Sequence, residues 1–485
     1  MKERKLKDLL LSDGTPFAKI SKYLILAIPL CWVGVTMDND FWFTINHGRY
    51  ILEHGFTNIE PFTVHEGLAF SFEKWLTCIT FYKIYDWFGT WGMYVFILLV
   101  FCVIIWLFYK VCLLFSGNSQ NISLLITSVN MCFFGINYIR TRPQIFSYVF
   151  MLAELYCLEK YAQTGNIKKL YPLPLLSFLY MQFHSTMLPI FFIIMLPYIC
   201  DFGWFKVLGI GGSKYKKWPL LAAFAACALT SLINPYGVRS FVYLINSLND
   251  GGLLSNINEV KRSSFNDIIG CCGAVLAFRL VAIAARIGRK ETYPLRHFLM
   301  SLGTFAMALY AVRNNAFYIL MGGAVAAYQL KSIGTGYNIM PVLKKIAGIA
   351  VIASIIYTAV YPYDIMRSTY AWKALDAFKA MHPDTNVTMY TDFNCGSYAE
   401  WLGFKCYADP RAEVFLKSVN GKEDILAEVW DSMHRRITAQ ELQEKYDFDY
   451  WLVQSDYSLD YQIRNKSDYK LLVEEDGYKV YEHIK

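Results

Sequence analysis

The chain has 485 residues, of which 55% are hydrophobic, 17% aromatic and only 18% charged. Its mean hydropathy is +0.30 and its net charge is +7, with the basic residues gathered in short clusters between apolar runs. This composition is typical of an integral membrane protein and argues against a nucleic-acid-binding surface, and the sequence holds no glycine-rich phosphate loop, zinc spacing or stacked-aromatic RNA motif.

The N-terminus, MKERKLKDLLLSDGTPFAKISKYLILAIPL, is basic and then apolar, without a small-residue cleavage site. We therefore expect an uncleaved first span with its basic end in the cytoplasm. Eleven apolar runs recur along the chain, the first being this span: 18–48 (with its exit), 89–114, 122–138, 143–161, 171–183, 186–200, 218–233, 268–285, 297–312, 316–331 and 345–361. Since a spanning helix needs roughly 20 apolar residues, residues 1–361 are predicted to form an all-α membrane bundle of about 11 transmembrane helices.

The runs 171–183 and 186–200 are short, and we interpret them as full spans or as one broken or re-entrant pair. Because they form a pair, removing both leaves the sidedness of all other loops unchanged. With the N-terminus inside, alternate loops carry a clear excess of Lys and Arg, as the positive-inside rule requires. The chain is therefore predicted to be a multi-pass protein of the plasma membrane.

The first outer loop, 38–88, is unusually long for a connection between two spans. It contains two stretches, FWFTINHGRYILEHG and FSFEKWLTCITFYKIYDWF, in which apolar residues recur every three or four positions. Trp and Tyr lie at their edges, which is typical of amphipathic helices in the membrane interface. Pro61 and Gly67 mark the turn between them.

Polar residues recur at the outer boundaries of several different segments. Ionisable groups near the hydrocarbon edge tend to face a cavity of the bundle and to mark function. We therefore expect one shared site on this face. Its predicted members from separate segments are Asp38, Asp40, Arg140, Arg142, Gln182, His184, Asn234 and Arg313.

Residues 362–485 are polar and mixed in composition, and they are predicted to form a small extracytoplasmic α/β domain. AWKALDAFKAM and EDILAEVWDSM have the pattern of helices, whereas NVTMY, KCYAD, DYWLVQ and YKVYEH have the pattern of short strands. Cys395 and Cys406 lie in this region. Their pairing in a disulfide stays open, because two cysteines with ordinary spacing do not decide it.

One acidic pair and several arginines at a membrane edge suit a particular chemistry. A sugar carried on a polyprenyl phosphate already has a weakly basic leaving group, so it does not need the second carboxylic acid of a glycosidase. It needs cations at the phosphate, which Arg supplies with its bidentate fork, and one carboxylate as general base for the acceptor hydroxyl. The predicted partners are therefore a polyprenyl-phosphate-sugar donor, an acceptor and membrane lipids.

The stretch MDNDFWFTINHGRYILEHGFTNIEPFTVHEGLAFSFEKWL resembles the first outer loop of a family of bacterial multi-spanning proteins related to the GT-C glycosyltransferases. This chain departs from that pattern at Phe43, where a Trp is usual, at Glu60, where an Asp is usual, and at Lys74, which separates Glu73 from Trp75. Further similar motifs are RPQIFSY, FHST, NPYG, CGSYAEWL and ADPRAE. Gln182, Pro410 and the Asn258–Val260 segment differ from the usual residues.

The resemblance covers essentially the whole chain and implies a GT-C-like fold in the bacterial plasma membrane. It also implies an inverting glycosyltransferase that uses a polyprenyl-phosphate-linked sugar and carries its catalytic carboxylate in the first loop. The outer-face acceptor stays open between a glycan, a lipid and a protein. Sugar identity, metal dependence and oligomeric state do not follow from the sequence.

Each candidate residue also has a structural alternative. Asp38 and Asp40 are predicted as the catalytic pair, but one of them also suits the N-cap of the following helix, and the pair is a weak candidate for a divalent cation. No other cofactor is expected. Arg140, Arg142 and Arg313 are predicted to bind the donor phosphate, with interfacial anchoring as the alternative. Other predicted site residues are His184, His47, Gln182, Glu73 and Asn234, whereas Arg411 and Glu413 are expected to form a stabilising pair in the tail.

Two non-enzymatic functions compete with the transferase hypothesis. A lipid-linked-sugar translocator also needs arginines and an amphipathic cavity, but it is expected to carry polar residues deep in the spans and on both faces. The sequence concentrates them on one face. A membrane scaffold with a partner-binding outer domain would not need Asp38 or Asp40.

Overall fold

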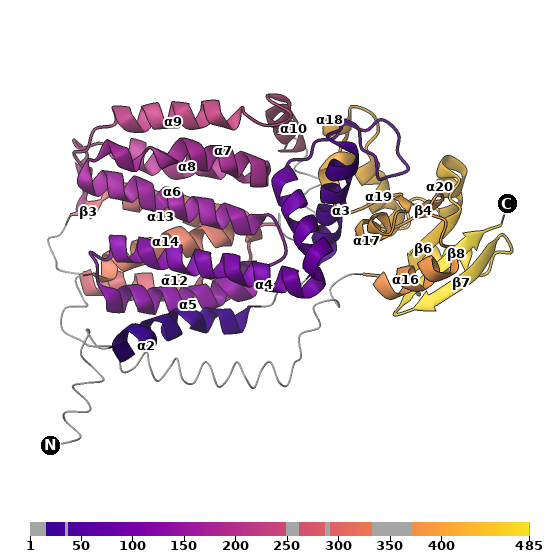
Figure 1. Cartoon of the computed structure of the whole chain (residues 1–485), viewed down its shortest axis with the longest axis horizontal. Helices are drawn as coiled ribbons and strands as arrows, with labels where there is room; N and C mark the ends of the chain where they lie inside the picture. The colour runs from indigo at the N-terminus through magenta and orange to yellow at the C-terminus, as the bar shows by residue number, and fades with distance from the viewer. Residues whose placement is uncertain (1–15, 34–36, 249–260, 287–291, 332–369, 485) are drawn as a thin grey trace, which may run out of the picture.

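The protein, described by a computed structural model, consists of a helical bundle with a smaller α/β unit at one end. The structure describes residues 16–33, 37–248, 261–286, 292–331 and 370–484. In Figure 1 the bundle helices lie roughly side by side along the long axis, and α3 of the first loop lies between them and the C-terminal unit. The arrangement places the first loop where both parts of the molecule can contact it.

Each predicted apolar stretch within the described residues coincides with one or more helices. The bundle helices are α2 (Pro16–Ala27) with η1 (Ile28–Trp32), α4 (Trp75–Phe115), α5 (Gln120–Tyr138), α6 (Gln144–Thr164), α7 (Pro172–His184), α8 (Leu188–Ile199), α9 (Trp218–Ser231), α12 (Phe265–Arg286), α13 (Leu295–Tyr310) and α14 (Asn315–Leu330). The predicted run 345–361 lies outside the described residues. A short helix, α10 (Arg239–Leu248), was not predicted.

The described part of the chain has three helical segments that are long and apolar enough to cross a membrane, judged by length and composition. They are Trp75–Phe115, Ile167–Ile199 and Phe265–Ala284. Lys22–Cys31 and Trp218–Ser231 are shorter apolar helices. A mainly helical membrane fold is therefore confirmed, while the number of eleven crossings stays a prediction.

The two amphipathic stretches of the first loop form helices by different routes. The first is α3 (Asn39–His54), which packs across the start of α4. A Cβ added at Gly48 would lie 2.1 Å from the carbonyl oxygen of Cys78, so the glycine allows this close crossing. The second stretch becomes helical at Trp75 and continues into α4, which is interrupted only at Gly89 (φ 58°, ψ −153°). Exposed Trp87 and Trp91 flank that interruption, as expected for an interfacial aromatic belt.

The short pair predicted at 171–183 and 186–200 is α7 and α8, which meet at a break at His184 (φ −160°, ψ 73°) and the 3₁₀ turn η3 (Ser185–Met187). The turn is fixed to the first loop, because the backbone N–H of Ser185 donates to the carbonyl of Glu73 at 3.0 Å. The far end of α8 returns to the C-terminal end of α6, where the Tyr198 hydroxyl donates to Glu159 at 3.0 Å. α7 therefore places His184 beside the first loop, and α8 runs back from there toward the C-terminal end of α6.

The C-terminal unit is built on a five-stranded mixed sheet in the order β5-β4-β6-β8-β7. Its strands are β4 (Thr388–Tyr390), β5 (Lys405–Cys406), β6 (Tyr450–Gln454), β7 (Tyr469–Glu475) and β8 (Tyr478–His483). β4 pairs in parallel with β5 and β6, whereas β8 runs antiparallel to β6 and β7. Its helical elements are α16 (Trp372–Met381), α17 (Gly396–Trp401), η5 (Ala412–Phe415), α18 (Lys417–Asn420), α19 (Ile425–Met433), α20 (Ala439–Tyr446) and α21 (Ser458–Ile463).

The predicted α/β character of the tail is confirmed, and the four predicted strands and two predicted helices are present. Strand β7 was not predicted, because only a few of its side chains are buried and a register irregularity at Leu471–Val473 interrupts its alternation. The proposed domain boundary at 361/362 lies outside the described residues. Cys395 and Cys406 are both buried free thiols.

The opposite end of the bundle holds a buried ionic cluster that the sequence did not predict. Arg296, at the start of α13, contacts Glu159 at 2.8 Å and Asp201 at 3.3 Å. His297 adds a contact of 3.2 Å to Glu159. All four side chains are at most 8% exposed, so this cluster joins α6, α8 and α13 inside the protein. The expectation that polar groups gather at one end alone was therefore wrong.

Candidate active site

The structure brings Asp38, Asp40 and Arg142 into one cluster. The Nε of Arg142 lies 2.7 Å from Oδ2 of Asp38 and 3.1 Å from Oδ2 of Asp40. Their side chains are 20%, 18% and 26% exposed for Arg142, Asp38 and Asp40, respectively, so they are partly desolvated but still reachable. Residues 104 positions apart in the sequence thus form one ionic cluster.

The helix-cap alternative applies to Asp38 by position only. Asp38 is the N-cap residue of α3 and Asp40 lies in the first turn. The Asp38 side chain makes no capping hydrogen bond to the helix; its Oδ2 faces Arg142 instead. A carboxylate directed at a guanidinium rather than at the helix amides favours a role in the site over a capping role.

The remaining predicted segments meet at the same end of the bundle. The Nδ1 of His184 lies 2.7 Å from the Ser147 hydroxyl on α6, a little over one turn beyond Arg142. Gln182 accepts a hydrogen bond from Trp75 Nε1 at 3.0 Å and donates to the carbonyl of Ile233 at 2.8 Å, so it joins the first loop to the end of α9. Asn234 closes the following turn through contacts with Tyr236 N and Ser240 Oγ, both at 2.9 Å. Gln182 and Asn234 thus position segments of the site.

Lys74 is the cation that the sequence interpretation missed. Its Nζ lies 4.3 Å from the centre of the Phe43 ring, one turn along α3 from Asp40. Lys74 and Arg313 both interact electrostatically with His184, so both cations lie near the same imidazole. Arg140 lies two residues before Arg142 in the same turn and is half-buried. The cluster is therefore rich in cations, as a phosphate site requires.

Glu73 faces a second acid from the C-terminal unit. Burial, and next to it the carboxylate of Glu413, raise the pKa of Glu73 to about 8, against the opposing charge of Lys74. Burial likewise raises the pKa of Glu413, again against Lys74. Glu73 Oε1 is buried and has no hydrogen-bond partner among the described residues. At neutral pH Glu73 is therefore a neutral carboxylic acid beside the site, with a proton that it can donate.

The raised pKa predicts a specific pH dependence for Glu73→Gln, which mimics the neutral acid. The unfolded chain ionises near the ordinary value of 4.5, whereas the folded protein holds the proton up to about pH 8. The wild-type protein should therefore lose stability relative to Glu73→Gln as the pH rises from 4.5 to 8, with no further change above. Thermal unfolding of both proteins across this range measures the difference. Glu53→Gln, at a largely exposed position, is the control; parallel curves for all three would contradict the prediction.

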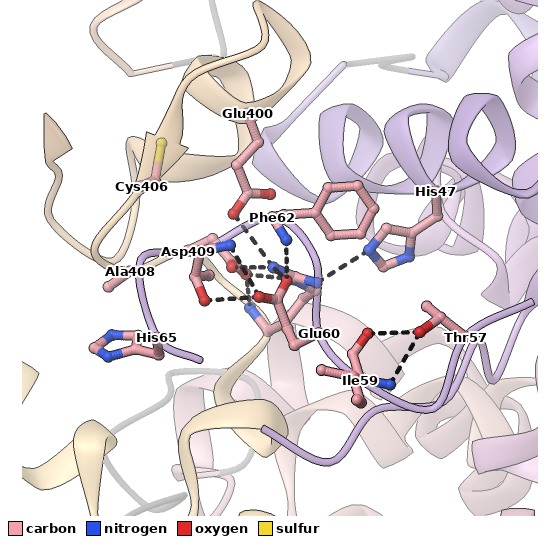
Figure 2. Close-up of polar contacts among 12 residues, drawn as sticks. His47, Thr57, Ile59, Glu60, Phe62, His65, Glu400, Cys406, Ala408 and Asp409 are labelled. Carbon is pink, nitrogen blue, oxygen red and sulfur yellow. Dashed lines mark hydrogen bonds and ion pairs between the residues drawn. The ribbon is translucent and has the colours of Figure 1, made fainter. Parts of the chain in front are cut away.

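A second polar cluster fixes the C-terminal unit to the first loop around Arg411. Its guanidinium contacts the carboxylates of Asp409, Glu60 (2.9 Å) and Glu400 (3.2 Å). Figure 2 shows these carboxylates and His47 directed toward one centre. Arg411 Nη1 lies 3.2 Å from His47 Nε2, so this predicted site residue belongs to the second cluster.

Charge balance in the Arg411 cluster follows from its burial. The Arg411 side chain is 1% exposed, and those of Glu60, Glu400 and Asp409 are fully buried. Burial opposes the charge on Arg411, but the carboxylates of Asp409, Glu400 and Glu60 outweigh it and raise the pKa of the guanidinium well above its usual value. Burial, followed by the charge of Arg411, lowers the pKa of His47 well below 6.5, so His47 is a neutral acceptor. The expected pair with Glu413 is replaced by acids from two parts of the chain.

The divalent-cation alternative has little support in the geometry. Among the residues that the structure describes, no group of three or more His, Cys, Asp or Glu side chains is arranged to hold a metal ion. Asp38 and Asp40 offer two carboxylates, and a guanidinium already lies between them. The donor set therefore fits an arginine-paired acid cluster better than a cation site built from these residues.

The fold is similar to that of solved membrane glycosyltransferases. AglB, the oligosaccharyltransferase of Archaeoglobus fulgidus, in complex with an inhibitory peptide and a dolichol-phosphate, matches with a TM-score of 0.54 and 11% identity over 90% of this chain and 68% of that chain. Its apo form matches with a TM-score of 0.53 and 12% identity over 90% of this chain and 69% of that chain. ArnT from Cupriavidus metallidurans, bound to undecaprenyl phosphate, matches with a TM-score of 0.47 and 11% identity over 96% of this chain and 97% of that chain. No protein-family model and no curated protein matches the sequence. This chain therefore has the fold of the GT-C membrane glycosyltransferases.

Proposed function

We propose that this protein is an inverting glycosyltransferase that moves a sugar from a polyprenyl-phosphate donor to an acceptor at the outer face of the plasma membrane. The observation that carries the proposal is the contact of Arg142 with both Asp38 and Asp40, 2.7 and 3.1 Å away. The same end of the bundle also holds His184, with Arg313 and Lys74 near it. The GT-C fold, shared with a transferase solved in complex with dolichol-phosphate, supports the same activity.

The residues supply each group that this transfer needs. Arg142 and Arg313, with Arg140 and Lys74, would neutralise the donor phosphate as the glycosidic bond breaks and negative charge develops on the leaving oxygen. A phosphate that takes the guanidinium of Arg142 leaves one of the paired carboxylates free to accept the proton of the acceptor hydroxyl. Attack by that oxygen on the face opposite the phosphate inverts the anomeric centre. Asp40 and Asp38 are equivalent candidates for the base.

The acceptor is expected to approach from the side of the C-terminal unit. Glu73 and Glu413, the two acids with raised pKa values, lie where this unit meets the first loop. Neutral carboxyl groups are suitable hydrogen-bond donors to the hydroxyl groups of a glycan, a glycolipid or a glycosylated protein. The proposal leaves the identity of the sugar open.

A lipid-linked-sugar translocator remains the second candidate, because the cluster of Glu159, Asp201 and Arg296 provides polar groups at the other end of the bundle. These groups contact one another and are buried, which favours a structural role. A translocator would move the intact donor across the bilayer without consuming it. Donor consumption by the purified protein, measured with a sugar-labelled donor, therefore separates the two functions.

The binding part of the proposal is tested with a polyprenyl phosphate that carries no sugar. Arg142→Ala, Arg313→Ala and Lys74→Ala should each weaken its binding by about 10-fold or more, because one charge-assisted hydrogen bond to a charged group contributes about 1.5–3 kcal/mol. Lys83→Ala, at an exposed position whose partner Asp86 is 4.0 Å away, is the matched control and should bind as the wild type does. The proposal fails if wild-type protein in nanodiscs does not bind this lipid, or if all four variants bind it equally.

A further inference from the structure

A small hairpin lies at the end of the bundle opposite the C-terminal unit. Its strands are β1 (Lys206–Val207) and β2 (Ile210–Gly211), and β2 pairs in parallel with β3 (Tyr293–Pro294). The label of β3 in Figure 1 marks this end. The hairpin connects α8 to α9 within the loop that the charge distribution assigns to the cytoplasmic side.

The hairpin presents large apolar side chains outward. Trp204 is 79% exposed, Leu208 is 97% exposed and Val207 is 51% exposed. Phe202 stacks on Trp204 with ring centres 5.7 Å apart and an interplanar angle of 16°. The two rings therefore form one projecting aromatic edge, outside the hydrophobic core.

Leu208 occupies a backbone conformation that does not suit it. Leu208 and Gly209 form the two-residue turn of the hairpin with φ values of 47° and 78°. Such turns strongly prefer Asn-Gly or Gly at these positions, because a side chain with φ above zero is strained. The Leu208 side chain is 97% exposed, so it makes almost no contact with the described residues that would offset this strain. Neither the turn geometry nor packing against the described residues therefore explains a leucine at this tip.

The charged residues of the segment 202–218 are all basic. Lys206, Lys214 and Lys216 are exposed around the hairpin, and the segment 202–218 contains no acidic residue. Asp201, just before it, is buried against Arg296. A cationic rim around exposed Trp and Leu is the composition of segments that enter the interface of an anionic leaflet.

The hairpin is held firmly by the bundle. The backbone N–H of Ser213 donates to Asp201 Oδ1 at 3.1 Å, and Arg296 Nη1 donates to the Ser213 hydroxyl at 2.7 Å. The Tyr215 hydroxyl donates to the carbonyl of Tyr198 at 2.7 Å. The buried ionic cluster at this end therefore fixes the base of the hairpin, so that its tip projects in one direction.

We propose that residues 202–216 form a membrane-interface anchor that inserts Trp204 and Leu208 at the boundary between headgroups and acyl chains of the leaflet opposite the Asp38–Arg142 cluster. Lys206, Lys214 and Lys216 contact anionic phospholipid headgroups there. The anchor is independent of the transfer reaction, since none of these residues belongs to the candidate active site.

The test uses nitroxide labels on Leu208→Cys and, as a water-exposed control, on Asn465→Cys in the full chain. Label collisions with oxygen, which partitions into lipid, are compared with collisions with a water-soluble nickel chelate. The wild-type chain treated in the same way gives the signal of the native cysteines, of which Cys102 is exposed. Nanodiscs contain phosphatidylcholine either alone or mixed with phosphatidylglycerol. A thermal unfolding midpoint equal to that of the wild type confirms that the labelled variants are folded.

We expect the label at 208 to be accessible to oxygen and shielded from nickel in the anionic nanodiscs, with weaker shielding in phosphatidylcholine alone. Asn465→Cys should show the opposite pattern in both. Nickel accessibility at 208 equal to that at 465 would overturn the anchor. Shielding from both reagents would also overturn it, since that result indicates a protein contact. Equal shielding in both lipid compositions would overturn the role of the lysines.

Discussion

Of Asp38→Asn and Asp40→Asn, the variant that removes the general base is expected to transfer sugar about 10²–10⁴-fold more slowly than the wild type, the range typical of a positioned base. The amide keeps the size of the side chain but cannot accept the acceptor's proton. Transfer is measured with purified protein, a sugar-labelled polyprenyl-phosphate donor and an envelope fraction as the source of acceptor. Both variants should insert in the membrane and purify normally, because Asp38 makes no capping hydrogen bond to α3.

The comparison between the two variants assigns the base. The carboxylate that only pairs with Arg142 should tolerate asparagine better, because an amide still accepts a hydrogen bond from the guanidinium. Asp86→Asn, on the exposed face of α4, is the matched control and should transfer sugar at the wild-type rate. Full activity in both Asp38→Asn and Asp40→Asn would refute the transferase mechanism.

Removing the guanidinium at Arg411 is expected to have the largest effect on stability. Arg411→Ala leaves three buried carboxylates without their counter-charge and His47 without its donor. Removing one partner of a buried ionic cluster typically costs about 3–5 kcal/mol. The C-terminal unit should therefore separate from the first loop and unfold at a lower temperature. Thermal unfolding followed by tryptophan fluorescence measures this, because Trp401 and Trp451 both lie in that unit.

Two further variants show whether the effect comes from the cluster. Arg411→Lys keeps one charge but loses the fork that reaches several carboxylates, so its melting temperature should fall between those of the wild type and Arg411→Ala. Arg436→Ala removes an arginine that is 75% exposed and should change stability very little. Equal melting temperatures for Arg411→Ala and Arg436→Ala would contradict the assigned role.

Much of the fold was accessible from the sequence, because the relevant signals are local. A run of apolar residues marks a bundle helix wherever it occurs, and the predicted stretches 122–138 and 143–161 differ from α5 and α6 by only a few residues at their ends. The strand signals of the tail likewise depend on neighbouring residues, as in β6. β7 lacked a continuous alternation and was missed.

The sequence by itself determined that the chain has membrane helices and a long first loop with Asp38 and Asp40. It also placed Arg142 at a helix boundary that the alternation of predicted spans assigns to the same side of the membrane as that loop. The tertiary structure decided which groups touch. It paired Arg142 with both acids, placed Lys74 beside Phe43 and His184, and joined Arg411 to Glu60 across 351 residues. The physical reason is that helix and strand signals extend over a few neighbouring residues, whereas an ion pair depends on the packing of elements far apart in the chain, which no local pattern contains.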